Sequence, residues 1–206
     1  MPIFRLGQKT VLFLHIPKAG GTSIETWLSA HSGESFRLSR KTPLLPCVPQ
    51  HFHGELIDLL FAPGFFDYSF CVTRNPFRRL LSEYNYRMSH RKRRERIFPT
   101  PDFATWVRRT FRRYRRDPFV YSNHIRPQSE FRIDGTEVFR LEDGLQALQA
   151  RLVELTGVGL PEAIPEANRS AIRETNIDPK IVGEIYEFYR DDFRTFGYGK
   201  EPDATE

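Results

Sequence analysis

The stretch PKAGGTS, residues 17–23, combines groups suited to holding an anion. Gly20 and Gly21 let the backbone approach a ligand without a Cβ, and Lys18 supplies a cation. The hydroxyls of Thr22 and Ser23 can donate hydrogen bonds. A tight turn closed by a capping threonine explains the same residues without a ligand, so the loop alone leaves both interpretations open. It is not a nucleotide-triphosphate loop of the form G-x-x-x-x-G-K-[ST], because its lysine precedes the glycines.

A second candidate anion site lies in the stretch TRNPFRRLLSEYNY, residues 73–86. Arg74 directly follows an apolar run and can bind a phosphate through two parallel hydrogen bonds. Ser82 lies two helical turns after the start of the next predicted helix and can add a hydroxyl donor. A lone arginine in this position is more typical of a surface side chain. The two stretches in this order, each at a strand end, support a functional interpretation more strongly than either does alone.

Histidine is the natural candidate for a general base, because its pKa lies near neutrality. His51 and His53 lie between the two candidate anion sites, in the stretch PQHFHGEL. An extended segment would direct both rings to the same face. A His-x-His pair is also half of a metal site, but no further ligands follow at suitable spacing, so we expect no metal. Glu55 is an alternative base, and we expect a structural role for His15.

The stretch LHIPKAGGTSIETWL closely resembles the HxPKxGGTS signature of sulfotransferases that act on carbohydrates and related hydroxyl acceptors. In that family the signature binds the 5′-phosphosulfate of 3′-phosphoadenosine 5′-phosphosulfate (PAPS), and the nucleotide product is adenosine 3′,5′-bisphosphate. The resemblance implies that Lys18 contacts the bridging oxygen between phosphate and sulfate. It also implies that the rest of the loop holds the 5′-phosphate, namely Ala19, Gly20, Gly21, Thr22 and Ser23.

The resemblance also covers the second candidate anion site. The 3′-phosphate motif of the family is an arginine, a serine eight residues later and then an aromatic residue, which Arg74, Ser82 and Tyr84 match. Related sulfotransferases place a catalytic histidine between the two motifs, and the His-x-His resembles that of uronic-acid 2-O-sulfotransferases. The resemblance thus implies that His51 or His53 is the base, and it slightly favours His51.

Apolar runs without helical periodicity predict buried strands at residues 10–16, 66–73 and 136–141. Apolar residues at helical spacing predict a helix after a Thr22 or Ser23 N-cap, a short helix over 55–61, a helix from Pro76 after an Asn75 N-cap, and helices over 103–111, 144–156 and 179–196. Residues 32–49 are expected to form a long irregular connection.

Strands that alternate with helices indicate an α/β fold with a mainly parallel central sheet. The family resemblance implies the P-loop-like, three-layer form of this fold, as a single domain over residues 1–206. Weaker matches to the family continue through NHIRPQSEF, which contains His124, to FYRDDFRTFGY near the C-terminus.

The net charge of +5 conceals a strong asymmetry along the chain. Residues 87–116 contain 12 Lys or Arg and 2 Asp or Glu, so this stretch carries +10 and the remaining residues carry −5. The stretch could bind an anionic acceptor, close over the phosphates of the donor or form a solvated helix face. A nucleic-acid-binding module is an alternative, but the interleaved aromatic residues repeat at helical spacing and fit a core better. A P-loop kinase is a second alternative, which the position of the lysine disfavours.

Composition excludes several other classes of protein. Two cysteines cannot build a disulfide framework, which fits a cytoplasmic protein. The apolar run near the start is too short for a signal peptide, and no run approaches the roughly 20 residues of a membrane span. The family resemblance implies a hydroxyl-bearing acceptor, which can itself be anionic, as the partner. We expect no membrane span, and nucleic acid is the less favoured partner. None of these patterns indicates an oligomeric state.

Overall fold

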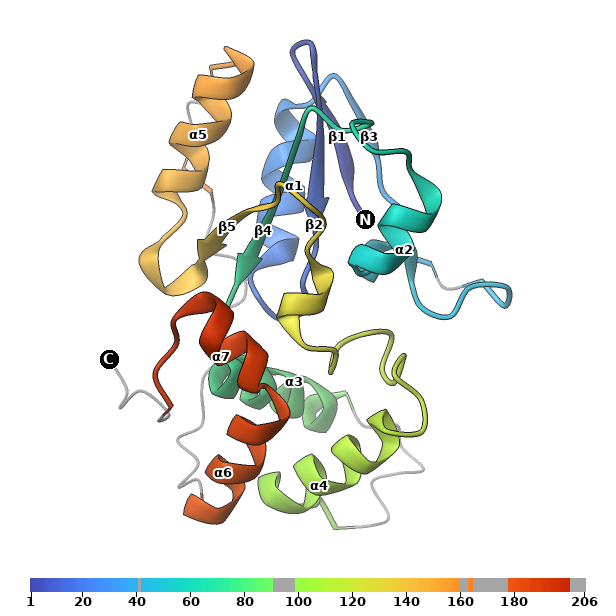
Figure 1. Cartoon of the computed structure of the whole chain (residues 1–206), viewed down its shortest axis with the longest axis vertical. Coiled ribbons are helices and arrows are strands. Elements are labelled where there is room, and N and C mark those ends of the chain that lie inside the picture. The colour runs from blue at the N-terminus through green and yellow to red at the C-terminus, as the bar shows by residue number, and fades with distance from the viewer. Residues whose placement is uncertain (41, 91–98, 160–162, 165–177, 201–206) are drawn as a thin grey trace.

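The computed structural model (Figure 1) describes residues 1–40, 42–90, 99–159, 163–164 and 178–200. Its centre is a five-stranded sheet with the strand order β3-β1-β2-β4-β5. The strands are β1 (Ile3–Leu6), β2 (Lys9–Leu14), β3 (Glu34–Phe36), β4 (Tyr68–Thr73) and β5 (Glu137–Arg140). The three strands β2, β4 and β5 pair in parallel, whereas β1 pairs antiparallel with both β2 and β3. The predicted α/β class with a mainly parallel sheet is confirmed.

The register of β2 and β4 determines which loops meet. Leu14 pairs with Cys71, so β2 ends about level with the later residues of β4. Because the two strands are parallel and adjacent, the residues that follow them emerge at the same edge of the sheet. The lysine loop and Arg74 are therefore brought together by the pairing of two central strands.

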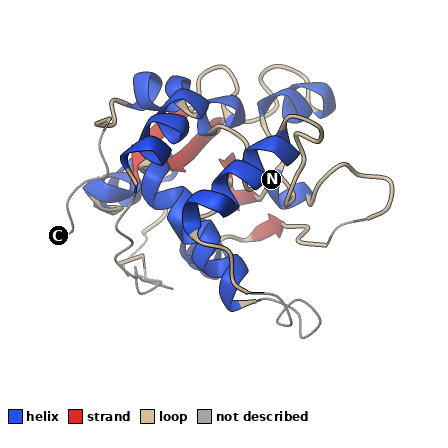
Figure 2. Ribbon diagram, turned by 90° about the horizontal axis from the view of Figure 1, so that it is seen from below, coloured by secondary structure: helices blue, strands red, loops and turns tan. Residues whose placement is uncertain are grey.

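Seven α-helices occur within the described ranges: α1 (Gly21–His31), α2 (Gly54–Leu60), α3 (Pro76–Ser89), α4 (Phe103–Tyr114), α5 (Gln146–Thr156), α6 (Pro179–Phe188) and α7 (Arg190–Phe196). Short 3₁₀ helices are η1 (Pro49–His51), η3 (Gln128–Phe131) and η4 (Leu141–Asp143). In Figure 1, α3, α4, α6 and α7 lie below the ends of β2 and β4 as a helical bundle. Seen from below, these helices lie in front of the strands (Figure 2).

Three groups of buried side chains hold the layers together. One group joins α1 and α5 to a face of the sheet, and includes Phe13, Trp27, Phe70 and Leu148. A second covers the other face with α2 and the 3₁₀ helices. A third fills the bundle of α3, α4, α6 and α7. The sheet is therefore covered on both faces, and the bundle is a separate apolar unit against the ends of its strands.

Several sequence predictions need correction. The strand β1 was not predicted, because IFRL is short and alternates, with Phe4 and Leu6 buried between more exposed residues. Residues 32–49, predicted to be irregular, contain the short strand β3. The helix predicted over 179–196 is divided into α6 and α7 at Tyr189, whose hydroxyl donates a 2.9 Å hydrogen bond to the carbonyl oxygen of Ile125. A buried long-range contact thus overrides the local helical pattern.

Candidate active site

The loop between β2 and α1 contains two residues in the left-handed backbone region, Lys18 with φ 68° and Gly20 with φ 80°. Gly20 is the N-cap residue of α1, and within the described chain no side chain caps this helix. The predicted cap at Thr22 or Ser23 is therefore wrong, because the helix starts directly after the left-handed turn at Gly20. The first amide groups of α1 face the loop without a capping side chain, as an anion site requires.

Close packing shapes the rest of the loop. An ideal Cβ on Gly21 would lie 2.4 Å from Nε2 of His15, so a larger residue does not fit without a shift of the ring. Ala19 is buried in the core, which leaves only its backbone to meet a ligand. Thr22 is exposed and Ser23 is buried. The predicted phosphate-binding residues thus form one short turn and the first residues of α1.

Lys18 lies over the ring of Tyr86 on α3, with Nζ 4.4 Å from the ring centroid. Burial lowers the pKa of Lys18 below its usual value, and Arg74 and Arg87 act in the same direction while Glu83 opposes them. The ammonium group therefore lies near two other cations. Such a cluster of like charges is stabilised when an anion binds.

Arg74 follows β4 directly, and its side chain reaches the lysine loop. Its Nη1 donates a 3.3 Å hydrogen bond to the carbonyl oxygen of Lys18. Its backbone N–H donates to Oε1 of Gln128, and Nε2 of Gln128 donates to the carbonyl oxygen of Arg74. Burial lowers the pKa of the Arg74 guanidinium. Ser82 lies on α3 and is buried. The structure therefore brings the two predicted phosphate-binding segments into direct contact.

Sequence reasoning missed Arg79, which is 2% exposed. Its Nε donates to the carbonyl oxygen of Pro17 at 3.0 Å. Its Nη2 donates to the carbonyl oxygens of His124 at 3.0 Å and Arg126 at 2.9 Å. One guanidinium thus fastens the residue before Lys18 to the segment that carries His124.

The C-terminal stretch FYRDDFRTFGY holds Gln128 in place. The Asp192 carboxylate is buried and accepts hydrogen bonds from the backbone N–H groups of Gln128 at 2.9 Å and Ser129 at 2.8 Å. Because Gln128 in turn binds the backbone of Arg74, this carboxylate indirectly fixes the second candidate anion site. The family resemblance pointed to the stretch, but only the structure assigns this role to Asp192.

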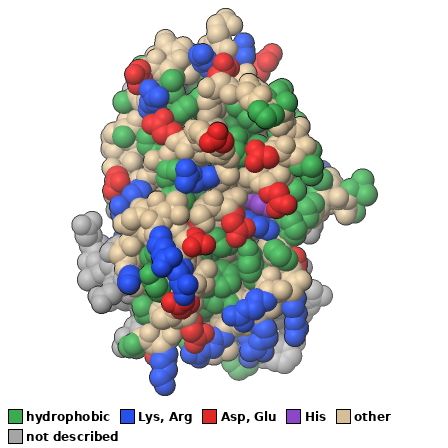
Figure 3. Space-filling view, in the orientation of Figure 1, with side chains coloured by type: hydrophobic (Ala, Val, Ile, Leu, Met, Phe, Trp, Pro, Cys, Tyr) green, Lys and Arg blue, Asp and Glu red, His purple; other side chains and the backbone are tan. Residues whose placement is uncertain are grey.

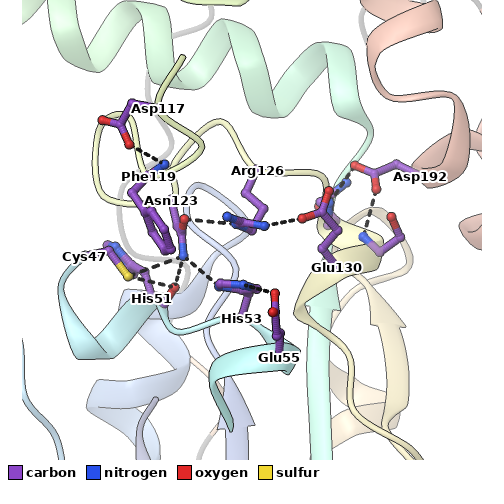
Figure 4. A network of polar contacts seen from close by, with 12 residues as sticks. Cys47, His51, His53, Glu55, Asp117, Phe119, Asn123, Arg126, Glu130 and Asp192 are labelled. Carbon is purple, nitrogen blue, oxygen red and sulfur yellow. Dashed lines mark hydrogen bonds and ion pairs between the residues drawn. The ribbon is translucent and has the colours of Figure 1, made fainter. Parts of the chain in front are cut away.

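Asn123 joins the two predicted base candidates (Figure 4). Its Nδ2 donates to the carbonyl oxygen of His51 at 2.9 Å and to Nδ1 of His53 at 3.3 Å. Both ring nitrogens of His53 have partners, because its Nε2 also faces the Glu55 carboxylate at 3.5 Å. Nδ1 of His51 donates to the carbonyl oxygen of Ser122 at 3.1 Å, and its Nε2 has no hydrogen-bond partner among the residues described. In this tautomer, Nε2 of His51 can take a proton.

A strained segment positions these groups. Tyr121, Ser122 and Asn123 are consecutive non-glycine residues with left-handed backbones, at φ 54°, 62° and 68°. Each such residue costs about 1–2 kcal/mol, so the conformation persists only where surrounding contacts hold it. In this structure the left-handed conformation directs the carbonyl of Ser122 and the side-chain amide of Asn123 toward His51. Strain of this kind is typical of functional sites.

Three imidazole rings form a row in which a buried carboxylate holds each end. The ring centroids of His15 and His51 are 5.2 Å apart, and those of His51 and His124 are 4.8 Å apart. Nδ1 of His15 pairs with Glu25, and Nδ1 of His124 lies 2.8 Å from Oε2 of Glu83. Burial lowers the pKa of His51 well below the usual range of a histidine, and both neighbouring rings add to this effect. Sequence reasoning missed both carboxylates, although Glu25 and Glu83 lie within the two matched stretches, because neither occupies a position of the motif itself.

The described parts of the basic stretch are its first residues, with Arg87 on α3, and residues 99–116, which contain α4. The aromatic side of α4 and Val107 are buried, as the helical spacing predicted, while its arginines are exposed. Lys and Arg side chains gather in the lower part of the molecule, over the region of α4 (Figure 3). A groove of about 710 Å³ between α4 and α6 is lined by some of these arginines and by none of the predicted site residues. Residues 91–98 of the stretch lie outside the described residues.

No group of three or more His, Cys, Asp or Glu side chains among the described residues could hold a metal ion. None of the helices in these residues combines the length and apolar character that crossing a membrane requires.

Comparison with known proteins agrees with the family resemblance of the sequence. The crystal structure of a sulfotransferase from Alicyclobacillus acidocaldarius is similar to this chain, with a TM-score of 0.51 and 15% sequence identity over 89% of this chain and 92% of that chain. At this identity the likeness concerns the fold alone. No curated protein matches the sequence. The sulfotransferase family matches residues 1–199, and the chain therefore belongs to the sulfotransferase family.

Proposed function

We propose that the protein transfers a sulfuryl group from PAPS to a hydroxyl group of a carbohydrate acceptor. One observation carries the proposal: the side chain of Arg74 donates a hydrogen bond to the backbone of Lys18. PAPS has anionic groups at its 5′ and 3′ positions, so it needs two cationic sites close together. The ends of β2 and β4 supply this pair.

In this proposal Lys18 and the start of α1 hold the 5′-phosphosulfate, while Arg74 and Ser82 hold the 3′-phosphate. Lys18 moves from the ring of Tyr86 toward the bridging oxygen, where it stabilises the negative charge that develops on the leaving phosphate. Burial and the neighbouring cations lower the pKa of Lys18. A bound anion would offset those cations and stabilise the ammonium form of Lys18. The main contributions to catalysis are therefore positioning and charge stabilisation.

We infer that His51 is the general base, since its Nε2 is available and both nitrogens of His53 have partners. As the acceptor oxygen attacks sulfur, its O–H bond breaks and the proton passes to Nε2. The bond from sulfur to the bridging oxygen breaks on the opposite side, in line with the attack.

Other features support a carbohydrate acceptor and a cytoplasmic location. The His-x-His, which resembles that of uronic-acid 2-O-sulfotransferases, supports a carbohydrate acceptor, and the arginines of α4 are compatible with an anionic one. Both cysteines are free and buried, which is compatible with the cytoplasm.

Incubation with radiolabelled PAPS and panels of oligosaccharides, peptides and lipids should label a sugar. Transfer only to a peptide or lipid would contradict the carbohydrate part of the proposal.

The donor site can be tested without knowledge of the acceptor. We expect adenosine 3′,5′-bisphosphate to bind the wild-type protein in isothermal titration calorimetry. Arg74→Ala should weaken that binding by about 10- to 150-fold, because it removes charged hydrogen bonds worth about 1.5–3 kcal/mol.

The control is Arg109→Ala, which removes the same charge from the exposed side of α4. The control should bind the nucleotide within about twofold of wild type. Equal losses in the two variants would indicate general electrostatic attraction and would contradict the assignment of Arg74.

A further inference from the structure

Glu83 is a buried carboxylate that no motif predicted, and both of its oxygens have partners. Its side chain is 1% exposed. Oε1 accepts a 2.6 Å hydrogen bond from Nε of Arg87, and Oε2 lies 2.8 Å from Nδ1 of His124. Although burial acts to raise the pKa of Glu83, His124 and Arg87 lower it, so the group is ionised. An ionised carboxylate keeps the proton of neutral His124 on Nδ1 and leaves Nε2 without one.

The position of His124 is fixed as firmly as its tautomer. Its carbonyl oxygen accepts a hydrogen bond from the same Arg79 guanidinium that binds the carbonyl oxygen of Pro17. His124 is therefore held beside the loop that carries Lys18. Its ring meets that of His51 at a centroid distance of 4.8 Å and an interplanar angle of 74°.

The surroundings of His51 stabilise its protonated form poorly. It has a carbonyl oxygen as its polar partner at Nδ1, and it lies between two other imidazoles. The rings of His124 and His15 and the buried N-terminal amine of Met1 all disfavour a positive charge on it. A proton on His124 would instead form an ion pair with the buried Glu83.

We propose that Glu83 and His124 form a proton-accepting pair that acts through His51. The inference rests on the proposed sulfuryl transfer. After Nε2 of His51 has taken the proton of the acceptor hydroxyl, the edge contact between the rings of His51 and His124 must shorten to a hydrogen bond. The Nε2–H bond of His51 then breaks and an N–H bond forms at Nε2 of His124. The positive charge moves from His51 to His124, where Glu83 neutralises it, and His51 returns to its neutral form. Glu83 and His124 are thus positioning residues for the base.

The charges around His124 determine the direction in which its pKa shifts when the charge of Glu83 is removed. Burial lowers the pKa of His124, as do Arg87 on α3 and Lys18 in the loop after β2, while Glu83 opposes them. The Arg79 guanidinium lies on its carbonyl oxygen, and the ring of His51 lies at its edge. Loss of the Glu83 charge would leave only groups that disfavour a proton on His124, so the pKa of His124 must fall.

The first test is the pH dependence of slow PAPS hydrolysis, in which water replaces the unidentified acceptor. Glu83→Gln should lower the limiting rate by about tenfold or more and move the acidic limb of the profile by about one pH unit or more toward lower pH. Glu137→Gln on β5 is the control, because it also removes a carboxylate that has two side-chain partners, Nε of Arg151 and the hydroxyl of Tyr68. The control profile should superimpose on that of wild type. An unmoved limb in Glu83→Gln, even with a reduced rate, would mean that Glu83 is only structural and would overturn the proposal.

The second test needs neither turnover nor a folded Glu83 variant. Histidine-selective ¹³C NMR of the wild-type protein, free and with adenosine 3′,5′-bisphosphate, should show that His124 takes up a proton at higher pH than His51. His124→Asn and His51→Asn assign the two signals. The reverse order would overturn the proposal. Failure of the wild-type protein to bind the nucleotide would instead contradict the proposed function, and the order of titration in the free protein would still test whether His124 accepts a proton more readily than His51.

Discussion

Gly21 shows how a single position depends on its neighbour in space. His15 is buried and paired with Glu25, so its ring cannot move away from the 2.4 Å approach that a Cβ at position 21 would make. We expect Gly21→Ala to lower the free energy of unfolding by about 1–3 kcal/mol, as overpacking does. It should also weaken binding of adenosine 3′,5′-bisphosphate, because it distorts the start of α1. Urea denaturation and calorimetry measure the two effects.

Gly33→Ala is the matched control for this change. Nothing lies within 4 Å of a Cβ at that position, so the added methyl group meets open space. Its free energy of unfolding should stay within about 1 kcal/mol of wild type. Equal stability of the two alanine variants would show that the His15 ring does not constrain the loop.

At the scale of elements, α3 carries much of the candidate site. Asn75 caps this helix, and its side chain accepts hydrogen bonds from the backbone N–H groups of Phe77 and Arg78. Ser82, Glu83 and Tyr86 all follow on the same helix. The direction in which α3 leaves β4 therefore sets the position of the serine proposed to bind the 3′-phosphate, the buried carboxylate and the ring under Lys18.

We expect Asn75→Ala to cost about 0.5–2 kcal/mol in unfolding free energy, which urea denaturation measures, and also to weaken nucleotide binding several-fold. Asp102→Ala is the matched control, because Asp102 caps α4 in the same way by accepting from the backbone N–H of Thr105. It should lose similar stability but bind the nucleotide like wild type. Normal nucleotide affinity in Asn75→Ala would show that the cap of α3 does not position the candidate site.

The elements that the sequence predicted are those with strong local signals. The apolar run of β4, the Asn75-Pro76 start of α3 and the aromatic side of α4 could be predicted because each is determined by residues close in the sequence. The strand β1 was missed although it pairs with β2 across the short turn at Gly7, because its four residues carry only a weak strand signal. The break at Tyr189 could not be predicted, because it coincides with a hydrogen bond to the distant Ile125.

At the scale of the whole molecule, the candidate site lies where the ends of the central strands meet the helical bundle. Spacing along the sequence identified Lys18 and Arg74. It could not identify Arg79, because the neighbouring Arg78 carries the same side chain and only the packing of α3 shows which of the two is fully buried. The same holds for Glu83, because its partner His124 lies 41 residues away in the sequence and only folding brings the two together.

The most direct test of the account is a crystal structure with adenosine 3′,5′-bisphosphate. We expect the 5′-phosphate to accept hydrogen bonds from the backbone at the start of α1 and from Lys18, with Nζ moved away from the ring of Tyr86. The 3′-phosphate should contact Arg74 and Ser82. A nucleotide bound in the groove between α4 and α6, or one whose two phosphates both avoid Lys18 and Arg74, would contradict the central claim.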